Sequence, residues 1–68
     1  MIDVYVREVS QEKGQFFGSF EPKEIPQLPI LFKENLTLLE NGNYAEYDTS
    51  YFKSSSGVYF VILVKECE

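Results

Sequence analysis

The fold is decided by VYFVILV, residues 58–64, a run of seven apolar residues. β-Branched and aromatic residues favour strands, and a run of this length suits a strand better than a helix. Because alternate side chains of a strand point to opposite faces, Phe60 and Ile62 would share one face, and Tyr59 and Val61 the other. Both faces are apolar. We therefore expect either a central strand covered on both sides or a strand that keeps one face for a partner.

Each end of the chain predicts a hairpin. Residues 2–9 alternate between apolar and polar side chains, and a polar turn that ends at Gly14 leads into a second strand at residues 15–20. Gly18 within that second strand indicates a bulge or a close approach of two backbones. Residues 51–53 and a Ser-Ser-Ser-Gly loop lead into the apolar strand and complete the last hairpin.

The pair Asn41-Gly42 predicts a third hairpin, because it is favoured in two-residue type I′ turns. The expected pairs across its strands are Glu40 with Asn43, Leu39 with Tyr44, Leu38 with Ala45, Thr37 with Glu46 and Leu36 with Tyr47. Since side chains alternate, the core face would carry Leu36, Leu38, Ala45 and Tyr47. The wet face would carry Thr37, Leu39, Tyr44, Glu46 and Asp48. A competing interpretation makes residues 34–40 a short helix that ends at the same Asn-Gly pair.

Three prolines divide the middle of the chain, Pro22, Pro26 and Pro29. Proline lacks a backbone donor and disfavours helix at the preceding residue, so residues 21–30 are expected to cross the sheet in irregular or extended form. Apolar residues would hold this crossing to the core: Ile25, Leu28, Ile30, Leu31 and Phe32.

These elements predict an all-β fold, or a β-rich fold with at most one short helix, in a single small domain over residues 1–68. Its architecture would be a small antiparallel meander of five to six strands. The meander would close into an SH3-like or OB-like barrel, or remain an open sheet packed on the proline crossing.

Composition limits the function classes. The formal charge of −5 argues against a DNA or RNA backbone as a partner, because phosphate binding needs clustered Lys and Arg, and we expect no binding of double-stranded DNA. The chain has no histidine and no nucleophile motif, so we expect no catalytic residues and no enzyme. One cysteine, Cys67, cannot hold structural zinc without histidine, and we expect neither metal nor cofactor. We expect no signal segment and no membrane span, and hence a cytoplasmic protein.

What remains is a surplus of apolar and aromatic surface on an acidic chain, which favours a small protein–protein interaction module. It would act as a regulator, inhibitor or accessory subunit that binds a protein partner or itself, as a dimer. The expected partner-binding residues are Phe17, Tyr44, Glu46, Asp48 and Tyr59. The alternative is a single-stranded nucleic-acid binder on an OB-like aromatic sheet face. In size and composition the chain resembles short bacterial, bacteriophage or mobile-element reading frames, which implies no site.

Overall fold

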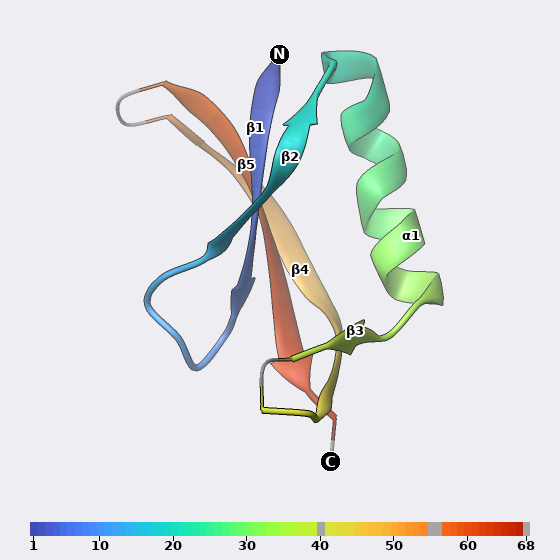
Figure 1. Ribbon diagram of the computed structural model, residues 1–68. Helices are drawn as coiled ribbons and strands as arrows, with labels where there is room; N and C mark the ends of the chain where they lie inside the picture. The colour runs from blue at the N-terminus through green and yellow to red at the C-terminus, as the bar shows by residue number, and fades with distance from the viewer. Residues whose placement is uncertain (40, 55–56, 68) are drawn as a thin grey trace.

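The computed structural model describes residues 1–39, 41–54 and 57–67. These residues form a strongly twisted five-stranded sheet with one helical segment across one face (Figure 1). The strands are β1 (Ile2–Glu8), β2 (Gln15–Phe20), β3 (Thr37–Leu38), β4 (Tyr44–Ser54) and β5 (Val58–Glu66). The helical segment is a 3-10 helix, η1 (Pro22–Gln27), followed directly by α1 (Leu28–Glu34). The prediction of a β-rich fold with five to six strands and at most one short helix is confirmed.

The connectivity differs from the antiparallel meander. In the described residues the strands lie in the order β2-β1-β5-β4-β3, and β1 is parallel to β5. The other pairs, β1 with β2, β4 with β5 and β3 with β4, are antiparallel. The sheet curls into a half-barrel. A parallel pair requires a long crossover between its strands, and here η1, α1, β3 and β4 all lie between β1 and β5 in the chain.

Strand β5 lies at the centre of the sheet, as its apolar sequence predicts, between β1 and β4. On the face toward the helical segment Phe60, Ile62 and Val64 are buried, with Ile62 0% exposed, whereas Val58 at the start of the strand is exposed. On the opposite face Val61 is also buried, at 6% exposed, whereas Tyr59 and Leu63 are only half-buried. The buried core consists of Val4, Ile25, Leu28, Ala45, Phe60, Ile62 and Val64. The helical segment therefore covers one face of the sheet, and the other face has no such layer within the described residues.

The proline-rich segment is helical, so the expected irregular or extended crossing is wrong. Pro22 and Pro29 each stand at the first or second position of a helix, where proline's fixed φ suits the first turn and its missing N–H has no partner to lose. Of the five residues expected to hold this crossing, the structure buries Ile25 and Leu28 and half-buries Phe32. The other two, Ile30 and Leu31, are exposed.

The third hairpin is present, but its register is one residue from the expected one. Leu38 pairs with Tyr44, and the N–H of Leu39 donates to the carbonyl of Asn43 at 2.8 Å. The N–H of Gly42 donates to the carbonyl of Leu39 at 3.0 Å, and Gly42 has a φ of 88°. These bonds fit a three-residue loop with a glycine in the left-handed region, instead of a two-residue turn. The pair expected between Glu40 and Asn43 falls on residue 40, outside the described residues.

The one-residue shift exchanges the two faces of β3. Leu36 and Leu38, expected in the core, are 59% and 63% exposed. Thr37 and Leu39, expected on the wet face, are half-buried instead, and Leu39 packs against the core. The β4 residues keep their predicted faces: Ala45 and Tyr47 lie inward, and Tyr44, Glu46 and Asp48 are exposed. The competing helix over residues 34–40 is wrong, since α1 ends at Glu34 and β3 follows.

Candidate functional site

The half-barrel is open between its two edge strands, β2 and β3. Two adjoining hollows, of about 570 Å³ and about 360 Å³, occupy this opening and share Phe17, Phe32 and Thr37 in their linings. Together we call them the apolar groove. Other apolar side chains that line it are Val6, Phe16, Phe20, Leu28, Leu31, Leu36, Leu38, Leu39 and Val64. The groove follows from the topology, because β2 and β3 are separated by three strands in the sheet and do not pair within the described residues.

Three phenylalanines form one wall of the apolar groove. The ring of Phe17 stacks with Phe20 at a centroid distance of 5.8 Å and meets the ring of Phe32 edge-on at 5.4 Å. Phe17 reaches this side because β2 carries a bulge: Val4 pairs with Gly18 and Tyr5 pairs with Phe16, which leaves Phe17 as the extra residue. A Cβ added at Gly18 would lie 3.1 Å from the Phe20 ring, a tight contact, so glycine suits the bulge.

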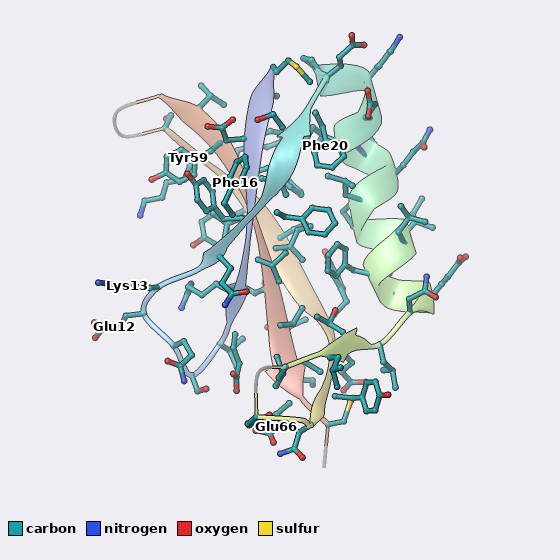
Figure 2. All side chains as sticks on the ribbon, in the orientation of Figure 1. Glu12, Lys13, Phe16, Phe20, Tyr59 and Glu66 are labelled. Carbon is teal, nitrogen blue, oxygen red and sulfur yellow. The ribbon has the colours of Figure 1, made fainter. Side chains whose placement is uncertain are left out.

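Phe16 and Phe17 face opposite ways because side chains alternate along a strand, and the bulge decides which of the two faces the groove. Phe16 packs edge-to-face on Tyr5 at 5.6 Å, on the face of the sheet away from the helix. Figure 2 shows Phe16 and Tyr59 on that side and Phe20 on the helix side. Both rings keep a large apolar surface in solvent, since Phe16 is 59% exposed and Phe17 is 50% exposed.

The rim of the apolar groove is apolar and exposed on the side of α1 and β3, whereas polar residues complete the lining of the larger hollow: Glu8, Gln11, Lys13, Gln15 and Asn41. Leu31 of α1 and Leu36 after it are both more than half exposed, and so is Leu38 of β3. Contiguous exposed apolar side chains of this kind mark interaction sites on soluble domains. The free edge of β2 borders the same opening, and an edge strand presents unpaired N–H and C=O groups to an incoming chain. The site therefore offers both apolar contacts and backbone hydrogen bonds.

The five residues expected to bind a partner do not lie on one surface. Phe17 lines the apolar groove, and Tyr59 belongs to the opposite face, where its ring meets Tyr5 at 5.5 Å. Tyr44, Glu46 and Asp48 are exposed along β4. The structure groups Phe17 instead with leucines that the sequence analysis had assigned to the core: Leu31, Leu36 and Leu38. A three-residue loop at Asn41-Gly42 would have revealed the outward position of Leu36 and Leu38.

Most of the acidic side chains and the cysteine, which are the candidate metal ligands and nucleophile of the sequence, can be located among the described residues. No group of three or more Cys, Asp and Glu side chains there could hold a metal ion. Glu46 is 3.8 Å from the ammonium group of Lys65, and both side chains are about half exposed. Cys67 is a free thiol, half-buried, whose backbone N–H donates to the carbonyl of Tyr44. No helix among the described residues is long and apolar enough to cross a membrane.

Comparison with known proteins gives no match: no family model, no curated protein and no solved structure matches the chain.

Proposed function

We propose that this protein is a small acidic protein-binding module, a regulator, inhibitor or accessory subunit that takes an extended apolar segment of another protein into the apolar groove. The observation that carries the proposal is the opening of the half-barrel, where exposed leucines face a phenylalanine wall beside the free edge of β2. A segment laid along β2 would extend the sheet by one strand and place alternate side chains in the groove.

Size and charge support the same occupant. The two hollows of the groove, about 570 and 360 Å³, match the space that a few large side chains fill. The net charge of −5 favours a partner whose apolar segment has basic flanks, because complementary charge speeds association and excludes acidic competitors. The proposed setting is the cytoplasm, since the single cysteine leaves no internal disulfide.

The test is a selection of displayed 12-residue random peptides on the native protein, followed by titration of the isotope-labelled protein with the selected peptides in NMR. We expect peptides with alternating apolar residues that shift amide signals of β2, α1 and β3. Leu38→Glu should weaken their binding by at least tenfold, because it places a carboxylate on the apolar rim.

Val58→Glu is the matched control. Val58 is 57% exposed against 63% for Leu38, the change in charge is the same, and the residue starts β5 at the other end of the sheet (Figure 1). It should leave peptide binding within twofold of the native protein. Selected peptides that bind both variants equally, or that shift only signals of the face away from α1, would contradict the proposal.

A further inference from the structure

The face of the sheet away from α1 carries a further hollow, of about 460 Å³, in addition to the two hollows of the apolar groove. Its described lining is Tyr5, Arg7, Glu12, Lys13, Gly14, Tyr51, Lys53, Tyr59 and Val61. We call it the tyrosine hollow. It shares Lys13 and Gly14 with the apolar groove and otherwise lies on the opposite side of the sheet.

The register of the strands sets the order of side chains in the tyrosine hollow. Tyr5 of β1 and Tyr51 of β4 both pair with Val61 of β5, so the three form one row across the sheet. Lys53 pairs with Tyr59 in the next row toward one end, and Arg7 pairs with Leu63 in the next row toward the other. The floor of the hollow therefore includes Tyr5, Tyr51 and Tyr59, with the rings of Tyr5 and Tyr59 edge-to-face, and a basic residue lies in the row on either side.

Three of the six basic residues of the chain, Arg7, Lys13 and Lys53, meet in this hollow, against one lining carboxylate, Glu12. The ion pairs among the described residues lie elsewhere, at Lys23–Glu21 and Lys65–Glu46. The cations of the hollow are therefore not neutralised by those carboxylates. The described lining is therefore positively charged on a chain whose net charge is −5.

Two contacts hold the margin of the hollow in place. Arg7 Nη1 donates to the carbonyl of Gln11 at 2.6 Å, which ties the β1–β2 loop to β1. Figure 2 shows Glu12 and Lys13 projecting from that loop. Asp3, which pairs with Tyr59 in the ladder, accepts a hydrogen bond from Ser19 at 2.7 Å.

We propose that the tyrosine hollow binds an aromatic base that carries a phosphate, as one unit of a single-stranded nucleic acid. The base stacks on the tyrosine floor, and the phosphate lies against Arg7 or Lys53. The volume suits one nucleotide. An acidic peptide would satisfy the cations and leave the tyrosine floor without a planar partner, so the observations favour the nucleotide. This function is separate from peptide binding in the apolar groove.

The chain has five tyrosines and no tryptophan, so stacking of a base is measured directly as quenching of tyrosine fluorescence. The probe is a decamer of deoxythymidylate, titrated at low salt, with the ribo-uridylate decamer and free thymidine monophosphate as separate arms. We expect quenching by the decamers, and an affinity that falls with salt with a slope of about −2 for three cations on a single strand. Quenching by the mononucleotide as well would identify a free nucleotide as a further source of the same ligand.

Paired variants separate the tyrosine hollow from general charge and aromatic content. Tyr51→Ala should weaken binding of the decamer by about fivefold or more, and Lys53→Glu by about tenfold with a shallower salt slope. The matched controls are Tyr44→Ala and Lys23→Glu, which remove an exposed ring and reverse an exposed cation outside the hollow. Both control variants should bind the decamer with an affinity within twofold of that of the native protein. Tyr51→Phe, which keeps the ring, should also bind as the native protein does.

Several outcomes would overturn the proposal. They are the absence of quenching at low salt, equal binding of an abasic strand of the same length, equal binding of polyglutamate, and equal loss in the control variants. An abasic strand that binds equally would show that no base is stacked. Since Lys53 is exposed, Lys53→Glu keeps the proposal testable even where Tyr51→Ala fails to fold.

Discussion

The two faces of the sheet differ in what covers them. On one face η1 and α1 bury Val4, Phe60, Ile62 and Val64 almost completely. On the other, the side chains of β5 are flanked by their neighbours on β1 and β4, and Val61 is buried whereas Tyr59 is half-buried. Burial of apolar side chains on the first face stabilises the fold, whereas the second face keeps aromatic and basic side chains at the surface.

The comparison shows how a chain of 68 residues can have both a core and binding surfaces. A domain this small has a core on one face of its sheet only, because a second covering layer would need another helix or sheet. Several of its remaining apolar side chains lie at the opening of the half-barrel and on the uncovered face, and Phe52 and Val58 are exposed near the β4–β5 turn. We therefore expect the two faces to contribute unequally to the free energy of unfolding.

The largest expected effect is on the covered face. Ile62→Ala should lower the free energy of unfolding by about 3–4 kcal/mol, because it leaves a cavity under the helix where the native side chain is 0% exposed. Domains of this size have only about 3–5 kcal/mol of stability, so much of the variant should be unfolded at 25 °C. Urea denaturation followed by circular dichroism measures the loss. Val61→Ala, on the uncovered face, should cost about 2 kcal/mol, and an equal loss in the two variants would contradict the asymmetry.

A smaller effect is expected among the aromatic residues of the uncovered face. Tyr5 meets Phe16 at 5.6 Å and Tyr59 at 5.5 Å, both edge-to-face. Tyr5→Leu keeps an apolar side chain and removes both ring contacts, so it should lower the free energy of unfolding by about 1–2 kcal/mol. Tyr44→Leu, at an exposed position outside the ring contacts of the described residues, serves as the control in the same denaturation experiment and should change the free energy of unfolding by less than about 0.5 kcal/mol. Equal losses would show that ring contacts do not stabilise this face.

The smallest effect is expected at the exposed end of β4. Glu46 and Lys65 form an ion pair at 3.8 Å with about half of each side chain in solvent. Glu46→Gln should change the free energy of unfolding by less than about 0.5 kcal/mol, because such pairs are screened and entropically costly. Thermal unfolding of the native protein and the variant at low and high salt measures this change in the free energy of unfolding. A loss above 1 kcal/mol would mean that the uncovered face depends on charge pairing as well as on aromatic packing.

Much of the fold was predictable because it depends on local pattern. The apolar run of β5 predicted its central place, and the β1–β2 and β4–β5 hairpins followed from alternation and turn residues. The helix was missed because proline was weighed only as a helix breaker, whereas Pro22 and Pro29 stand where a helix starts. The register of β3 was missed by one residue because Asn-Gly serves two-residue and three-residue loops alike.

The candidate sites were less predictable than the fold. Phe17, expected to bind a partner, lines the apolar groove, but its neighbours there come from α1 and β3, whose faces depend on that helix and that register. Arg7, Lys13 and Lys53 are scattered along the sequence and meet only when β1, β4 and the β1–β2 loop come together.

By itself the sequence determined a strand-rich fold around a central strand with two apolar faces, because side-chain alternation is a property of a few consecutive residues. Only the tertiary structure decided that β1 lies parallel to β5, that β2 and β3 stay apart, and which side chains line the resulting openings. Those outcomes depend on closing long loops and on packing a helix against one face, and neither is encoded in any short stretch of the chain.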